Sequence, residues 1–194
     1  MLKRNGEKIL TTFYSDESGY SLSEAHRDQV WNPPRKQGKV DFPKQDVRVN
    51  WWGAISSRGA TSIHIYKGSL KTEDYQAILE EHKEEMDQLF PEGYYFQQDN
   101  LSVHTAAEGW MQEKGYDIVN FPTYSPDLTP IENLWGVLKN AVAKENPKTE
   151  KALCDSLLRN WEVLTTAENL QPYFENLYVR YRECIDKDGK TLNY

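Results

Sequence analysis

Cysteine is scarce in this sequence and long apolar runs are absent, and each absence excludes a class of protein. Among 194 residues there are two cysteines, Cys154 and Cys184, both in a segment with helical periodicity. A disulfide framework or a cysteine-rich zinc site is therefore excluded, which favours a reducing compartment. No apolar run approaches the ~20 residues of a membrane span, and the polar N-terminus lacks a secretory signal. We expect no membrane partner.

Positive charge is also in deficit, because 23 Lys and Arg residues face 30 Asp and Glu residues, for a net charge of -7. This balance argues against a protein that binds nucleic acid by electrostatics alone. The deficit is uneven: residues 1–70 hold 11 basic and 7 acidic residues, whereas residues 71–194 hold 12 and 23. A polyanion is therefore expected to lie against the N-terminal half or to be met through a bound cation.

What is present is a regular alternation of strand and helix patterns. Strands are predicted over about 8–14, 48–56, 61–66, 94–98 and 117–121, and helices over about 72–90, 105–114, 131–144, 149–164 and 166–185. Residues 15–19 (SDESG) read as a turn, and Thr105 with Glu108 as a helix-opening capping box. This order predicts an α/β fold with one mixed five-stranded sheet and helices on both faces, which is the element order of the ribonuclease-H-like fold.

The same pattern predicts the domain organisation. We expect a catalytic domain over residues 1–146, with a basic, proline-bearing loop at about 32–46, because long loops in compact domains are usually functional. Residues 147–194 are expected to form a C-terminal helical extension packed on the same domain.

Three carboxylates follow the predicted strands. Asp16 ends the first strand, Asp99 ends the fourth, and Glu132 begins the helix after the fifth. If the first and fourth strands are parallel neighbours, these acids converge at one edge of the sheet. Clustered carboxylates repel one another, and hard cations such as Mg²⁺ or Mn²⁺ relieve the repulsion. Two such ions clamp a phosphodiester, one activating the attacking oxygen and the other stabilising the leaving oxygen.

Each acid also has a local explanation. Asp16 suits a turn between strands, and Asp99 suits a cap of the turn that follows it. Thr129 and Glu132 form a capping box with Pro130 at the first helical position, and the local sequence favours capping there. Only the joint placement of the three acids makes the catalytic interpretation competitive.

The segments around these acids resemble a known family. They are SDES at 15–18, QQDN at 97–100 followed by His104, and SPDLTPIENLW at 125–135, with supporting matches at 30–31 and 52–56. Together they resemble the catalytic domain of mariner-superfamily DDE transposases over about residues 9–144. The 125–135 run is the most specific of them.

The resemblance implies a ribonuclease-H-like fold, two Mg²⁺ or Mn²⁺ ions, and DNA strand cleavage and strand transfer in cut-and-paste transposition. It assigns catalytic and metal-binding roles to Asp16, Asp99 and Glu132. It also implies double-stranded DNA (transposon ends and target) as a partner and a homodimer as the working unit. The nucleus is the expected location in a eukaryotic host, and the cytoplasm otherwise. The residues expected to contact DNA or the second subunit are Trp31, Arg35, Lys36, Lys39 and Lys44.

Three polar residues beside the acids are candidates for supporting roles. His104 is placed to touch substrate or a metal-bound water, or else to pack against the next helix. Asn133 is placed to orient Glu132, or else to lie in solvent, and Asn100 follows Asp99 directly. The tryptophans other than Trp31 are expected in the core.

The sequence departs from the family pattern at three points. Only 32 residues separate Asp99 from Glu132, and Leu101-Ser102-Val103 replaces an acidic, proline and basic run. Paired helix-turn-helix domains that read transposon ends do not precede the first strand, so we expect a catalytic fragment, a truncated copy or a domesticated remnant. A catalytically silent interaction module is therefore the alternative function. A nuclease for RNA·DNA hybrids is a third, which the PIENLW run disfavours.

Overall fold

The computed structural model describes residues 8–27, 47–119 and 128–186, with the side chains of 25–27, 184 and 185 left aside. The basic loop at 32–46 lies outside the described residues. So do the five residues predicted there and beside it to contact DNA or a second subunit, namely Trp31, Arg35, Lys36, Lys39 and Lys44.

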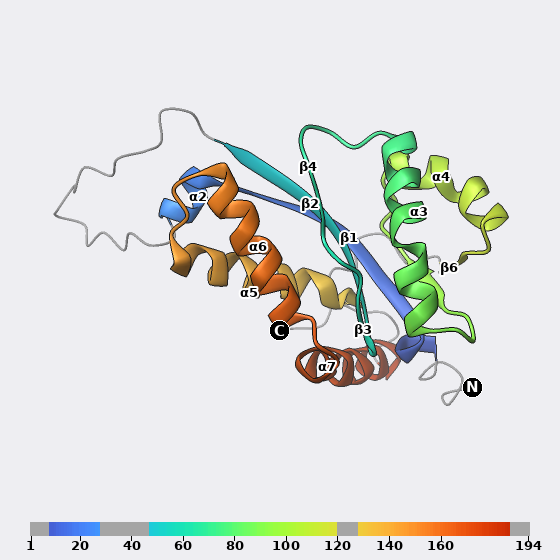
Figure 1. The fold of residues 1–194 in the computed structure, drawn as a ribbon. Coiled ribbons are helices and arrows are strands. Elements are labelled where there is room, and N and C mark those ends of the chain that lie inside the picture. The colour runs from blue at the N-terminus through green and yellow to red at the C-terminus, as the bar shows by residue number, and fades with distance from the viewer. Residues whose placement is uncertain (1–7, 28–46, 120–127, 187–194) are drawn as a thin grey trace.

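A mixed sheet forms the centre of the molecule (Figure 1). Its strands are β1 (Thr12–Ser21), β2 (Arg48–Ser56), β3 (Gly59–Ala60), β4 (His64–Tyr66), β5 (Tyr95–Gln97) and β6 (Asp117–Val119). The order across the sheet is β3-β2-β1-β5-β6, with β4 also paired to β2. β1 runs antiparallel to β2 and parallel to β5, and β5 runs parallel to β6. The predicted mixed α/β sheet is confirmed.

The strand count is six rather than five, because the strand predicted over 61–66 is interrupted. β3 and β4 each pair antiparallel with β2 but leave 61–63 between them. Thr61 occupies the break, where its side-chain oxygen accepts a hydrogen bond of 3.1 Å from the backbone of Ala54. This side-chain bond replaces a backbone ladder bond, so the strand pattern is interrupted without loss of pairing.

The first strand differs most from its prediction. Residues 8–10 are helical, and β1 runs straight through the SDESG segment that reads as a turn. Antiparallel pairing with β2 continues from Tyr14 opposite Ile55 to Ser21 opposite Arg48. The hydrogen bonds of this long ladder outweigh the local turn preference of Asp, Ser and Gly. A Cβ at Gly19 would meet the side-chain ends of Asn50 and Arg48, so a larger residue there would have to displace them.

Helices cover both faces of the sheet (Figure 1). One layer holds α3 (Thr72–Leu89) and α4 (Ser102–Glu113), and the other holds α2 (Leu22–Arg27), α5 (Pro130–Glu145), α6 (Glu150–Leu164) and α7 (Ala167–Asp186). Adjacent residues of β2 enter opposite cores, Trp51 on the α5 side and Trp52 on the α3 side. This alternation is the period-two pattern of a strand buried on both faces.

The C-terminal helices share the core of the α/β unit. Trp161 on α6 stacks on Trp135 of α5 with ring centroids 5.1 Å apart, and its indole N–H donates a 2.8 Å hydrogen bond to the carbonyl of Thr61. Leu170 and Phe174 of α7 are buried in the same cluster. Among the described residues, no helix combines the length and apolar character needed to cross a bilayer.

The start of α4 lies earlier in the chain than predicted. α4 begins at Ser102, ahead of the predicted capping box at Thr105, because the Asp99 side chain accepts the backbone N–H of Leu101 at 3.0 Å and closes the preceding turn. Its end is as predicted, with Gly115 at φ +85° stopping the helix.

Candidate active site

Asp16 and Asp99 extend from neighbouring strands at the same level of the sheet. The parallel ladder between β1 and β5 ends at Tyr14 opposite Gln97, and each aspartate lies two residues further on. The hydroxyl of Ser15 donates a 3.0 Å hydrogen bond to the Gln97 carbonyl and secures this junction. Asp16 lies in the middle of β1, so the prediction that it ends its strand is wrong, although the strand beside it does end there.

Asp16 lies on the side of the sheet covered by α5. Its Oδ2 accepts a 2.9 Å hydrogen bond from the indole N–H of Trp135, one turn along α5 from Glu132. Burial raises the pKa of Asp16 to about 7, with repulsion from Glu17 and Glu132 adding to the effect and the Trp135 bond opposing it. A carboxylate held against two other negative charges is a natural ligand for a cation.

Asp99 is held by a different element. Its Oδ1 receives a 2.6 Å hydrogen bond from Nδ1 of His104 and the 3.0 Å bond from the backbone of Leu101. Burial favours the neutral acid, but these hydrogen bonds outweigh it, so the pKa of Asp99 lies below its usual value. The Asp99 carboxylate is therefore ionised at neutral pH. Because its side chain is half-exposed, it is also accessible.

His104 links α4 to β1. Its side chain is almost fully buried, its ring lies 4.3 Å from that of Tyr75, and its Nε2 lies 3.2 Å from Oε1 of Glu17. Burial by itself lowers the pKa of His104, but bonds to Asp99 and Glu17 outweigh it and raise the pKa to about 10. The imidazolium therefore bridges two carboxylates at neutral pH.

Glu17 is the member of this group that sequence reasoning missed. The available signal was strand alternation, because Glu17 follows Asp16 and so points to the opposite face, toward α4. That signal was lost when the segment was interpreted as a turn.

Glu132 occupies the first turn of α5 and is exposed. The side chain of Thr129 makes no cap hydrogen bond there, so the capping box favoured by the local sequence is not formed. Asn100 and Asn133 are exposed as well. Asn133 lines a pocket of about 250 Å³ whose other residues, including Tyr173 and Arg180, come from α7. Their predicted supporting roles stay predictions.

The three acids offer oxygen ligands only, which is the donor set that Mg²⁺ and Mn²⁺ prefer. Burial chiefly raises the pKa of Asp16, and the repulsion from Glu17 and Glu132 that adds to it is what a bound cation would relieve. Among the described residues, the one group of three side chains whose ligand atoms all lie within 4.8 Å of one another is a different cluster. The oxygens of the three acids therefore do not all lie within that distance of one another. A bound cation must draw these side chains together.

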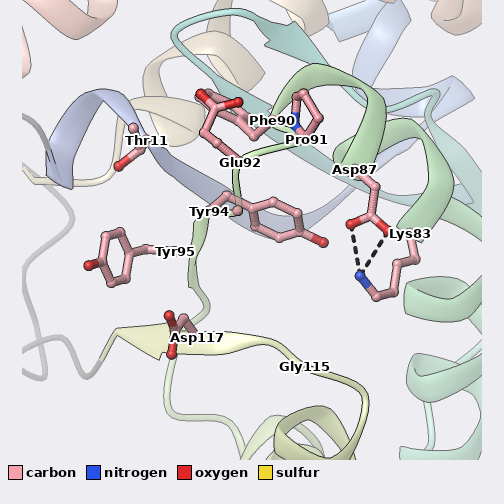
Figure 2. A pocket seen from close by; sticks show the side chains of 11 residues that line it. Thr11, Lys83, Asp87, Phe90, Pro91, Glu92, Tyr94, Tyr95, Gly115 and Asp117 are labelled. Atoms are coloured by element: carbon pink, nitrogen blue, oxygen red, sulfur yellow. Dashed lines mark hydrogen bonds and ion pairs between the residues drawn. The ribbon is translucent and has the colours of Figure 1, made fainter.

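A larger hollow lies at the opposite end of the sheet. Figure 2 shows this pocket of about 740 Å³, lined at the beginnings of β5 and β6 by Tyr95 and Asp117 and by residues 90–94. Its cation, Lys83, is already paired with Asp87 at 2.8 and 3.0 Å. The pocket therefore has volume, but its close ion pair, Lys83 with Asp87, lies within the single helix α3.

Comparisons with known proteins agree with this arrangement. Residues 11–154 match the family model of the DDE superfamily endonucleases. The Tc3 transposase of Caenorhabditis elegans is 28% identical over 190 residues, covering 93% of this chain and 57% of the relative, and the Tc1 transposase of the same organism is 25% identical, covering 93% and 69%. The chain thus spans little more than half the length of the Tc3 transposase.

Solved structures show the same fold. A Mos1 transposase paired-end complex with the left transposon end superimposes with a TM-score of 0.79 at 19% identity, over 99% of this chain and 60% of that one. The Mos1 transposase catalytic domain with Raltegravir and Mg superimposes with a TM-score of 0.75 at 18% identity, over 99% and 91%. The predicted fold and family are confirmed. With most of its length matched by one family model, the chain belongs to the DDE superfamily of endonucleases.

Proposed function

We propose that this chain carries out metal-dependent DNA strand cleavage and strand transfer, the chemistry of cut-and-paste transposition. Asp16, Asp99 and Glu132 are the proposed catalytic residues and the ligands of two Mg²⁺ or Mn²⁺ ions. The observation that carries the proposal is the end of the β1–β5 ladder. Asp16 and Asp99 each lie two residues beyond its last pair, and Glu132 is close enough to add to the raised pKa of Asp16.

The protein groups around the acids have separable tasks. When bound, the metal ions supply charge to neutralise the scissile phosphate and to activate the attacking oxygen. Trp135 orients Asp16 through its indole N–H, while His104 and Glu17 hold Asp99 from the other face of the sheet. A side chain of α5 thus orients Asp16 and a side chain of α4 orients Asp99, so both carboxylates are held in fixed directions.

The proposed partner is double-stranded DNA, and the proposed working unit is a homodimer. Support comes from the relatives, which are transposases, and from Mos1, whose structure is a paired-end complex with a transposon end. Because the net charge of the chain is negative, we expect metal ions and the more basic N-terminal half to neutralise the DNA phosphates. Trp31, Arg35, Lys36, Lys39 and Lys44 remain the predicted contacts.

Nicking of supercoiled plasmid by the purified chain tests the proposal. With millimolar Mn²⁺ we expect nicking that EDTA stops and that Asp99→Ala lowers at least about 100-fold, the scale of loss for a group that stabilises the transition state. Asp117→Asn is the matched control, because it alters an exposed carboxylate at the opposite end of the same sheet. Comparing duplex DNA with an RNA·DNA hybrid distinguishes the transposase activity from that of a hybrid nuclease.

Thermal unfolding provides a readout that does not depend on turnover. Mn²⁺ at 100 times its dissociation constant should stabilise the wild type by about 2.7 kcal/mol, and Asp16→Asn should remove the shift. If Mn²⁺ does not change the melting temperature and the chain does not nick plasmid, the catalytically silent interaction module is the better description.

A further inference from the structure

A second cluster of metal-ligating side chains lies away from the three acids. His64 of β4 and Glu81 and His82 of α3 bring one possible ligand atom each within 4.8 Å of one another. Nδ1 of His64 lies 3.1 Å from Oε2 of Glu81, and the two imidazole rings meet edge to face at 5.8 Å. Nothing in the proposed transposase chemistry uses these residues.

The proton on His82 is placed by its neighbours. Its Nδ1 lies 3.1 Å from Oε2 of Glu85 and 3.2 Å from the hydroxyl of Ser62. That hydroxyl donates its own proton to Glu85 at 2.6 Å, and the Ser62 backbone N–H donates to the same carboxylate at 2.7 Å. Both oxygens of Glu85 thus accept hydrogen bonds from Ser62, so this carboxylate acts as an acceptor. Nδ1 of His82 must therefore be the donor.

This arrangement leaves the other ring nitrogen without a partner. The side chain of His82 is 4% exposed, and its Nε2 is buried with no hydrogen-bond partner among the described residues. A neutral imidazole with Nδ1 protonated presents a lone pair at Nε2. A carboxylate that holds one nitrogen of a histidine while the other faces a metal is the usual outer support of zinc ligands.

We propose that His64, Glu81 and His82 bind a Zn²⁺ ion. Two nitrogens and one carboxylate oxygen, completed by water, form the donor set of an open zinc site. Ligands about 2.0–2.1 Å from a tetrahedral zinc lie roughly 3.3 Å apart, so the present 4.8 Å limit requires shifts of at most roughly 1.5 Å. His64 and Glu81 also line a pocket of about 290 Å³, through which water reaches the ion.

The ion would join two elements that are separate in sequence. His64 lies on the short strand β4, opposite Trp52 of β2, and His82 stacks on the same tryptophan at 5.3 Å. Zinc would therefore pin β4 to the middle of α3. The nitrogen donors distinguish this site from the three acids, since Mg²⁺ avoids imidazole whereas Zn²⁺ accepts it.

Calorimetric titration of Zn²⁺ into the full chain, in excess Mg²⁺, tests the proposal. We expect one site whose affinity falls at least about 10-fold in Glu81→Gln and about 100-fold in His64→Ala. Glu84→Gln is the matched control, because it is exposed on the same helix and should bind Zn²⁺ as the wild type does. Co²⁺ should give the visible absorption of a four-coordinate ion, which His64→Ala should abolish.

Two results would overturn the zinc site. One is equal Zn²⁺ affinity in the wild type and in Glu81→Gln, a change at an exposed side chain that leaves the fold intact. The other is loss of Zn²⁺ binding in Asp99→Ala, which would place the ion at the three acids instead. Because excess Mg²⁺ is present and turnover is not measured, failure of the zinc site leaves the proposed transposase function standing.

Discussion

The two ends of the central sheet differ in what they bring together. At one end lie Asp16 of β1, Asp99 just after β5, His104 of α4 and Glu132 of α5, and the pKa of Asp16 rises to about 7 there. At the other end lies the 740 Å³ pocket, where the one cation among the described lining residues, Lys83, is paired within a single helix. Titratable groups from several elements with shifted pKa values mark a candidate active site better than the volume of a pocket does.

The largest expected difference between the two ends concerns stability and pH. Because the pKa of Asp16 rises from 3.8 to about 7 on folding, the folded protein binds a proton that the unfolded chain releases. The metal-free protein should therefore lose stability as pH rises from about 4 to 7, by at most about 4 kcal/mol. Asp16→Asn, which keeps an acceptor for Trp135, should remove this loss and stabilise the protein at pH 8.

Urea unfolding of both proteins in EDTA at pH 5 and pH 8 measures this effect. The quantity to compare is the difference between wild type and variant, because His104 also titrates above pH 6.5, where its own contribution is lost as pH rises toward 10. Asp117→Asn, at the pocket end, should follow the wild type. If the free energy of unfolding changed with pH in the same way in wild type and Asp16→Asn, the pKa of Asp16 would not be raised in the folded protein.

A smaller effect is expected at the support of Asp99. Glu17→Gln keeps an acceptor near Nε2 of His104 but removes a negative charge, so the imidazolium loses one of its two counter-charges. We expect a lower pKa for His104 and a loss of about 1–2 kcal/mol at pH 7. An NMR titration of the His104 ring measures the pKa, with Glu113→Gln on the exposed side of α4 as the control. An unchanged His104 titration would contradict the bridge.

The smallest effect belongs to the pocket end. Lys83→Ala removes a pair that spans one helical turn, between side chains 29% and 50% exposed. Such pairs contribute about 0.3–0.5 kcal/mol, and plasmid nicking should be unchanged. A clear loss of nicking in Lys83→Ala would instead show that the pocket end of the sheet takes part in DNA cleavage.

Much of the fold could be read from local pattern. β2 spans Arg48–Ser56 as predicted, and α3, α5, α6 and α7 follow their apolar periodicity to within about two residues. Errors fell where local chemistry was ambiguous. The SDESG segment has turn-forming residues but forms part of a strand. The sequences at Thr105 and Thr129 match the capping-box motif, but Thr105 lies inside α4 and the Thr129 side chain makes no cap hydrogen bond.

The functional residues divide in the same way. The sequence by itself predicted the three acids and the family, because those predictions rest on residue types in a specific order; the family is confirmed, and the roles of the acids are the proposal. Only tertiary structure decided that Glu17 reaches His104, that Trp135 holds Asp16, and that His64 meets His82 across β4 and α3. These contacts depend on strand pairing and on which face a side chain takes, and a one-residue change in register would reverse every face.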